Sequence, residues 1–166
     1  MGLISHAVGM KKQFTATGYV VNSSRTRLLM IYHRGLGRWL PPGGHVDPDE
    51  FPGDTVLREV REETGAHAHH AGEPDLDLGL NGTTEAQLPT PFATAAQLIP
   101  ASAKDIEHIH MDLMYLLIAA DSGPLQPHET EVDVARWFTR EEILEGGESP
   151  DSARAFAARH LLGSVD

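Results

Sequence analysis

The chain has 166 residues, 40% of them hydrophobic and 22% charged, which is the size and balance of one globular domain and excludes a disordered or repeat protein. Its 13 Lys and Arg against 24 Asp and Glu leave a formal charge of -11, so it would repel long nucleic acid and we expect no such partner. With no cysteine, the chain has no disulfide, thiolate metal site or cysteine nucleophile.

The amino-terminal segment, residues 1–12, lacks the sustained apolar core of a signal peptide. No later run reaches the roughly 20 apolar residues that a membrane-spanning helix needs. We therefore expect residues 1–12 to be a loosely ordered leader and residues 13–166 to form a single domain, with no membrane partner and a cytoplasmic location. Because the net charge would also repel a bare polyphosphate, a phosphorylated substrate would need a bound cation.

The first third of the domain predicts a hairpin, a loop and a helix. β-branched and aromatic residues over 13–21 and an apolar run over 27–33 predict two strands joined by a polar turn. Residues 35–44 hold four glycines and two prolines, so we expect an irregular loop with no regular element. A helix is expected from residues 52–54 to Gly65, because proline suits a first helical turn and glycine suits the position after the last.

The rest of the chain predicts more strands. Residues 75–80 and 92–98 are candidate strands in a stretch that is otherwise hard to interpret. A long strand is expected over 106–120, whose end, MYLLIAA, is apolar enough to be buried on both faces. A shorter strand is expected over 132–138.

Two helices are expected near the carboxyl end. Thr139 and Glu142 have the spacing of a capping box, which predicts a short helix that ends at Gly146. Ser149, followed by proline, is expected to open a last helix that Gly163 closes. Strands thus precede, separate and follow the helices, which predicts an α/β layered domain with a mixed sheet.

The most informative segment is 43–66, GGHVDPDEFPGDTVLREVREETGA. On a helix its apolar residues share one side, while three carboxylates lie roughly 120° away: Glu59, Glu62 and Glu63. Carboxylates at such spacing repel one another by a few tenths of a kcal/mol, roughly, per pair. A cation bound between them would turn that cost into affinity, and carboxylate oxygens suit Mg2+ or Mn2+.

The same charges allow a second interpretation, in which Arg58 and Arg61 pair with the glutamates on a solvated helix surface. The preceding Pro-Pro-Gly-Gly turn favours the metal interpretation. Its small residues let backbone carbonyls approach the carboxylates and complete an oxygen-rich site.

The spacing in this segment resembles the motif of the Nudix hydrolase family, G-x5-E-x7-R-E-U-x-E-E-x-G-U, in which U is a bulky aliphatic residue. The matching positions are Gly44, Glu50, Arg58, Glu59, Val60, Glu62, Glu63, Gly65 and Ala66. Ala66 is smaller than the motif prescribes, and PPGG stands where the family more usually has Leu-Pro-Gly-Gly. The resemblance extends over residues 13–145, through GLGRWLPPGG, HMDLMYLLIA and EVDVARWFTREEI.

The resemblance implies an α/β/α sandwich and the metal-dependent hydrolysis of a pyrophosphate linkage in a nucleoside diphosphate derivative or related small nucleotide. It implies a catalytic set of Arg58, Glu59, Glu62 and Glu63. The three glutamates are the implied ligands of Mg2+ or Mn2+, with the Gly43 carbonyl assisting and Glu59 as the first candidate for general base.

The resemblance also implies supporting residues. Glu50 and Arg58 are expected to form a pair that braces the helix. Gly44 and Gly65 are expected to support the same structure. A distant acidic residue is expected to add a metal ligand, and Glu129 and Glu131 are both candidates. The oligomeric state stays open, with a homodimer as one candidate.

Other polar and aromatic residues are candidates for substrate contact: His33, Arg34, Trp39 and His110. His108, His110 and Asp112 alternate on one strand face, as in the start of the H-x-H-x-D-H zinc motif of binuclear metallohydrolases, but Leu113 breaks that motif. We therefore favour structural or substrate-facing histidines over a zinc site. Packing is favoured over base stacking for Trp39 and Trp137.

Three hypotheses follow from these patterns. The first is the metal-dependent hydrolase described above. The second is a non-catalytic nucleotide-binding module on the same fold, which would have no need of crowded carboxylates. The third is a zinc hydrolase built on His108 and His110. The identity of the nucleotide derivative is open in all three.

Overall fold

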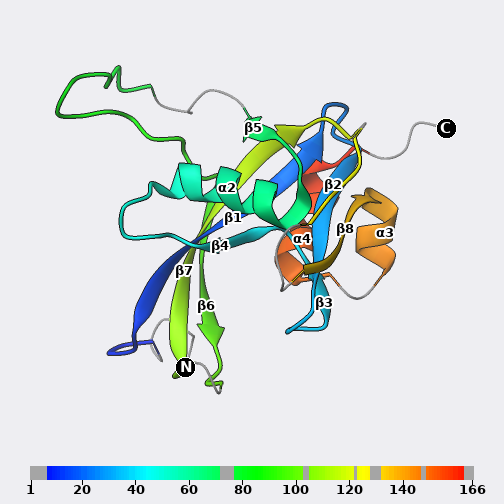
Figure 1. Cartoon of the computed structure of the whole chain (residues 1–166), viewed down its shortest axis with the longest axis horizontal. Helices are drawn as coiled ribbons and strands as arrows, with labels where there is room; N and C mark the ends of the chain where they lie inside the picture. The colour runs from blue at the N-terminus through cyan, green and yellow to red at the C-terminus, as the bar shows by residue number, and fades with distance from the viewer. Residues whose placement is uncertain are drawn as a thin grey trace.

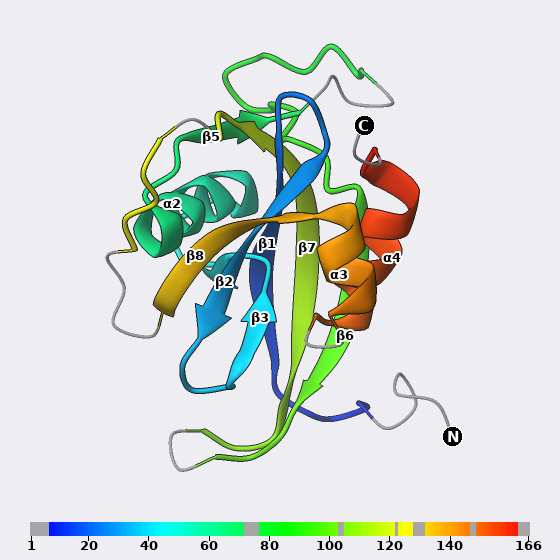
Figure 2. The same ribbon diagram turned by 90° about the vertical axis from the view of Figure 1, so that its right-hand side faces the viewer.

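One mixed sheet of eight strands carries helices on both of its faces, in the residues that the computed structural model describes (7–71, 77–102, 105–121, 123–127, 132–146 and 149–162). The strands are β1 (Lys12–Asn22), β2 (Arg27–His33), β3 (Arg38–Leu40), β4 (Gly43–His45), β5 (Ala68–His70), β6 (Ala93–Ile99), β7 (His108–Ala119) and β8 (Val132–Thr139). The helices are α2 (Pro52–Thr64), α3 (Arg140–Glu145) and α4 (Asp151–His160). Figure 2 shows α2 on one side of the strands and α3 and α4 on the other.

The sheet is built around a parallel pair, β1 and β7, which stay in register from Lys12 opposite Ile109 to Asn22 opposite Ala119. The main strand order is β3-β2-β1-β7-β5, and β4, β6 and β8 pair with β1, β7 and β2 respectively (Figure 1). All of these other pairs are antiparallel. The mixed sheet between helices confirms the predicted fold class.

Each face of the sheet buries its own apolar cluster, because alternate residues of β1 point to opposite faces. Tyr19 and Val21 pack with residues of α3 and α4. Ala16 and Val20 pack with residues of α2. Strand β1 is therefore covered on both faces. The end of β7, for which the sequence predicted burial on both faces, also contributes residues to both clusters.

Helix α2 lies unusually close to β1. Val56 and Val60 are fully buried on its inner side, and a Cβ added to Gly18 would lie 2.9 Å from the nearest Val60 methyl. The helix begins with proline in its first turn and ends at Gly65, which has a φ of 74°. The predicted limits of this helix are confirmed, and the close contact with β1 fixes the position of its acidic side.

Two expectations about regular structure were wrong. Residues 35–44 are not wholly irregular, since β3 pairs with β2, and β4 starts at Gly43 and pairs with β1. Glycine is required in β4 because a Cβ on Gly43 would overlap the Ala16 carbonyl. In the segment 75–80, residues 77–80 form no strand, and residues 75 and 76 lie outside the described residues.

The carboxyl-terminal helices agree with the sequence in part. Thr139 and Glu142 form the predicted capping box at the start of α3, which ends at Gly146. Helix α4, by contrast, has Pro150 rather than Ser149 before its first residue, and no side chain caps it. It ends at Leu161, whereas Gly163 lies outside the described residues. No described helix combines the length and apolarity needed to cross a membrane.

Candidate active site

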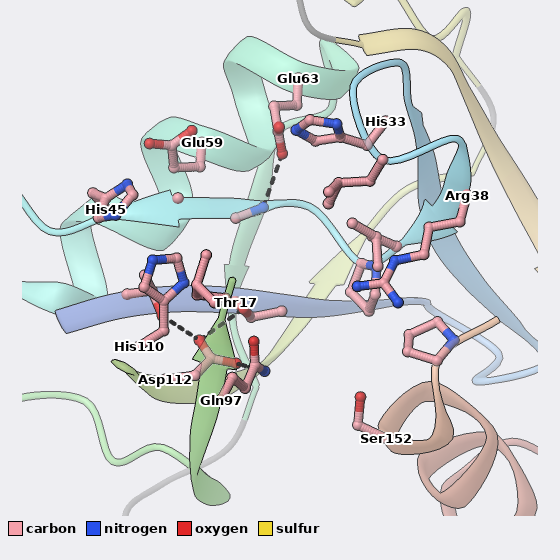
Figure 3. Close-up of a pocket in the computed structure, with 18 of the residues that line it drawn as sticks. Thr17, His33, Arg38, His45, Glu59, Glu63, Gln97, His110, Asp112 and Ser152 are labelled. Atoms are coloured by element: carbon pink, nitrogen blue, oxygen red, sulfur yellow. Dashed lines mark hydrogen bonds between the residues drawn. The ribbon is translucent and has the colours of Figure 1, made fainter. Parts of the chain in front are cut away.

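A cavity of about 780 Å³ opens between the acidic side of α2, strand β4 and the β1–β7–β6 part of the sheet. Figure 3 shows side chains from each of these elements along it, and Ser152 at the start of α4 also lines it. Of the motif residues, those that line it are Gly43, Gly44, Arg58, Glu59 and Glu63. The segment singled out from the sequence therefore forms one wall of the cavity.

Arg58 holds the acidic side of α2 together. Its Nε and Nη2 donate to the carboxylate of Glu50 at 3.1 and 3.0 Å. Its Nη1 donates to Glu59 at 2.8 Å and to Glu62 at 3.0 Å. The hydroxyl of Thr55 also donates to Glu50, at 2.8 Å. The pair expected between Glu50 and Arg58 is thus present, and two more carboxylates converge on the remaining arginine nitrogen.

These contacts keep both partners ionised. Hydrogen bonds from Arg58 lower the pKa of the Glu50 carboxyl. In return, the hydrogen bonds to Glu50 raise the pKa of Arg58, with smaller contributions from Glu59 and Glu62. The surface-pairing interpretation of the helix is therefore correct for Arg58, but the pairing takes place at a cavity wall.

The glycine pair of β4 lies directly against the acidic helix. The backbone N–H of Gly43 donates to the buried carboxylate of Glu63 at 2.8 Å. A Cβ added to Gly44 would overlap the carboxylate of Glu59. The turn therefore lies against the carboxylates, but it contacts Glu63 through a backbone amide, and the expected approach of backbone carbonyls stays a prediction.

The three motif carboxylates have different partners. Glu59 and Glu62 share Arg58, whereas Glu63 is bound to the Gly43 amide. Glu59 and Glu63 line the cavity, and the Glu62 side chain is 42% exposed. One ion could contact all three only after side-chain rotation that displaces the Nη1 of Arg58. Glu129 and Glu131, the candidates for a further ligand, lie outside the described residues.

A further carboxylate lines the cavity, on strand β7. Asp112 is 2% exposed and accepts hydrogen bonds from Thr17 at 2.8 Å, Thr15 at 3.1 Å and Gln97 at 3.4 Å. Burial raises the pKa of its carboxyl, against the effect of the threonine hydroxyls. The sequence had associated Asp112 only with the broken zinc motif. The feature of the sequence that could have pointed to Asp112 is the presence of an acidic residue within a largely apolar strand.

Two of the four predicted substrate contacts line the cavity, His33 and His110. Burial lowers the pKa of His110 to about 4, helped by the nearby His45, His108 and Lys11. This ring is therefore neutral at neutral pH.

The structure places Arg34 and Trp39 outside the cavity, so its geometry does not support a substrate contact from either. Arg34 is exposed and donates to Asp133 at 2.7 Å. The Trp39 ring packs edge-on against Phe138, with the ring centroids 4.7 Å apart, on the α3 side of the sheet. Arg38, which the sequence did not single out, lines the cavity instead.

Comparison with known proteins decides the family. The model of the NUDIX domain matches residues 12–159. The chain belongs to the NUDIX family. The family expected from the motif at 44–66 is thus confirmed. A NUDIX-family hydrolase from Clostridium perfringens has the same fold, with a TM-score of 0.74 and 23% identity, over 91% of this chain and 97% of that one.

Curated NUDIX relatives are named as hydrolases and phosphatases. Human m7GpppN-mRNA hydrolase NUDT17 is 30% identical over 147 residues, which cover 82% of this chain and 38% of that protein. Mouse bis(5'-nucleosyl)-tetraphosphatase is 51% identical over 47 residues, 28% of this chain and 32% of that protein. Phosphatase NudJ of Escherichia coli is 27% identical over 67% of this chain and 58% of that protein. The chain thus spans less than two thirds of the length of each of these relatives.

Proposed function

We propose that this NUDIX chain hydrolyses a phosphoric anhydride bond in a nucleoside diphosphate derivative or a related nucleoside polyphosphate, with Mg2+ or Mn2+ as cofactor. One observation carries the proposal: a single cavity has the carboxylates of Glu59 and Glu63 on one wall and the hydrogen-bonded carboxylate of Asp112 on another. The names of the mouse and human relatives, a dinucleoside tetraphosphatase and an mRNA cap hydrolase, support the substrate class.

The donor set fits a hard divalent cation. Two carboxylates, from Glu59 and Glu62, converge on the positively charged Nη1 of Arg58, and a metal ion would take the place of that nitrogen after the side chains rotate. Together with Glu63 they would hold Mg2+ or Mn2+ through oxygen atoms. When bound, such an ion neutralises charge on the diphosphate oxygens and lowers the pKa of a coordinated water.

The chain's own residues would orient the metal ligands, accept a proton and contact the substrate. Arg58, held by Glu50, orients Glu59 and Glu62, while the Gly43 amide orients Glu63. Glu59 is at the cavity wall and is the proposed general base that accepts the proton of the attacking water. The cationic side chain of Arg38 lines the same cavity and would contact a phosphate oxygen.

The rest of the substrate would extend toward β6 and β7. There Asp112 and Gln97 offer a carboxylate and an amide, which can recognise N–H and carbonyl groups of a nucleobase. On this proposal Asp112→Asn should raise KM more than it lowers kcat, because Asp112 would contact the base of the substrate and not the reacting phosphates.

A substrate panel tests the proposal. Release of phosphate or pyrophosphate from many nucleoside diphosphate derivatives is measured with Mg2+ and with Mn2+. The best substrate is then given to the variants Glu59→Gln, Glu62→Gln and Glu63→Gln. Each should lose more than about a hundredfold in turnover. Glu145→Gln, an exposed change on α3, is the matched control and should keep full activity.

Two results would count against the proposal. Unchanged turnover in all three glutamine variants would reject the assigned site. Binding of nucleotides without hydrolysis anywhere in the panel, with metal present, would instead support the non-catalytic binding module.

A further inference from the structure

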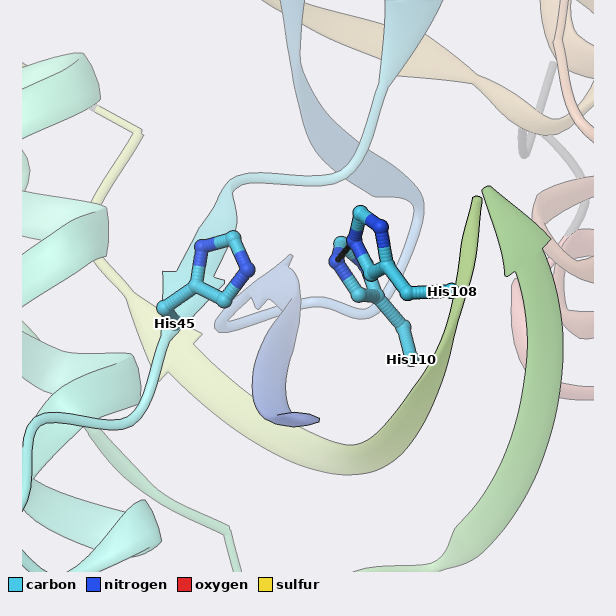
Figure 4. Close-up of side chains that lie close together, drawn as sticks. All are labelled: His45, His108 and His110. Atoms are coloured by element: carbon cyan, nitrogen blue, oxygen red, sulfur yellow. Dashed lines mark hydrogen bonds between the residues drawn. The ribbon is translucent and has the colours of Figure 1, made fainter. Parts of the chain in front are cut away.

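Three histidines meet at the wall of the cavity, outside the motif glutamates. His45 comes from β4, and His108 and His110 come from β7. One ring nitrogen of each lies within 4.8 Å of those of the other two. Among the described residues, these are the three metal-ligating side chains whose ligand atoms already lie close enough together to hold one ion. Figure 4 shows His45 facing the other two rings from β4, which is separated from β7 by β1.

The spacing of His108 and His110 suits a shared ion. Their Nε2 atoms are 3.1 Å apart. Two nitrogens bound to one tetrahedral zinc, each at about 2.0–2.1 Å, lie about 3.3 Å from each other. His45 is exposed, so its ring can rotate toward the pair without disturbing the core. The three rings therefore need only small movements to bind a common ion.

Backbone contacts fix the orientation of His108. Its Nδ1 lies 2.6 Å from the carbonyl oxygen of Ile106. Because a carbonyl oxygen only accepts, Nδ1 carries the hydrogen and Nε2 keeps its lone pair, directed at His110. The Asp105 carboxylate lies 3.9 Å from the same Nδ1. Metal-bound histidines typically have such a carbonyl or carboxylate partner on the other ring nitrogen.

The sheet register holds the group in place. His45 lies opposite Thr15 of β1, and Thr15 lies opposite Asp112 of β7, two residues after His110 on the same face. His108 is 5% exposed. Asp112 itself is not part of the group, since its oxygens accept from Thr15, Thr17 and Gln97. The group therefore differs from the broken zinc motif noted in the sequence, because it includes His45 and not Asp112.

We propose that His45, His108 and His110 bind one transition-metal ion of the Zn2+ class. Imidazole nitrogens suit Zn2+, Co2+, Ni2+ and Cu2+, whereas Mg2+ prefers oxygen. This site is thus chemically distinct from the glutamates. Since His45 and His110 line the cavity, the ion's fourth position is open to water or to an anionic oxygen of a cavity ligand. On binding, His110 moves its ring hydrogen to Nδ1, leaving Nε2 as the ligand.

The test measures the binding of metal alone, so its result does not depend on the hydrolase proposal. The untagged full chain is freed of metal with a chelator and titrated with Zn2+ by calorimetry, in excess Mg2+. We expect one Zn2+ per chain, and His45→Ala and His110→Ala should each weaken binding by more than about tenfold. His67→Ala, an exposed histidine outside the group, is the matched control and should bind as the unaltered chain does.

Cobalt gives a second measurement. Co2+ added to the chain should produce the intense visible absorption of a four-coordinate ion, and His45→Ala should abolish it with no change in circular dichroism. Glu59→Gln and Glu63→Gln should leave both signals intact. Loss of Zn2+ binding in these glutamine variants, equal binding in the histidine variants, or no stoichiometric binding at all would overturn the proposal.

Discussion

The guanidinium of Arg58 binds the carboxylate of Glu50 with two of its nitrogens, eight residues away in the sequence. This fork leaves Nη1 to Glu59 and Glu62. The loop before α2 and the acidic side of α2 are thus joined by one side chain. Because the arginine is planar, its grip on Glu50 also sets the direction from which the two helix carboxylates are held.

Replacing Arg58 by lysine should disable this arrangement. A lysine ammonium keeps the charge but cannot bind Glu50 through two parallel bonds while reaching two further carboxylates. We expect Arg58→Lys to lower kcat/KM by at least about tenfold, because the glutamates lose their fixed positions. Arg61→Lys, on the exposed side of the same helix, is the control. Equal kinetics in the two variants would show that the fork has no role.

The Glu50 carboxylate should make stability depend on acid pH. Arg58 lowers the pKa of Glu50, so its stabilising contribution is complete above the unfolded value of about 4.3 and is lost as pH falls through the lower folded value. Glu50→Gln should therefore lower Tm at neutral pH and flatten its decline in acid. Thermal unfolding from pH 7 downward measures this, with Glu145→Gln for comparison. Parallel Tm curves for Glu50→Gln and the unaltered chain would contradict the assignment.

The two glycines of β4 should respond differently to alanine. At Gly44 the added Cβ meets the end of the Glu59 side chain, which can move, so Gly44→Ala should keep its Tm but lose activity. At Gly43 the Cβ meets the backbone of Ala16 and Thr17, which cannot move without breaking the β1–β4 pairing. Gly43→Ala should therefore lower the free energy of unfolding by about 1–3 kcal/mol and lower the Tm. Similar Tm values for the two variants would refute this distinction.

The start of α3 offers a test of stability at a residue outside the cavity. Thr139 accepts from the Glu142 amide, and Glu142 accepts from the Thr139 amide. Thr139→Ala should cost about 0.5–2 kcal/mol in denaturant unfolding, without altering kinetics. Ser149→Ala is the natural control, because no side chain caps α4. An equal loss in both variants would mean that the capping box contributes nothing specific.

The sequence alone determined the features that depend on neighbours a few residues apart. The period of an α-helix placed Val56 and Val60 inside and the glutamates on another side, and the Thr139–Glu142 spacing defined a cap. The motif at 44–66 was enough to predict the family. These patterns are readable because backbone geometry within one helix does not depend on the rest of the fold.

Only the tertiary structure decided which distant residues meet. It brought Asp112 into the cavity, turned Trp39 onto Phe138, and placed His45 beside His108 and His110. Such contacts depend on strand order and register, and a shift of one residue reverses every side chain of a strand. Register is set by the summed packing of both sheet faces, which no local pattern contains.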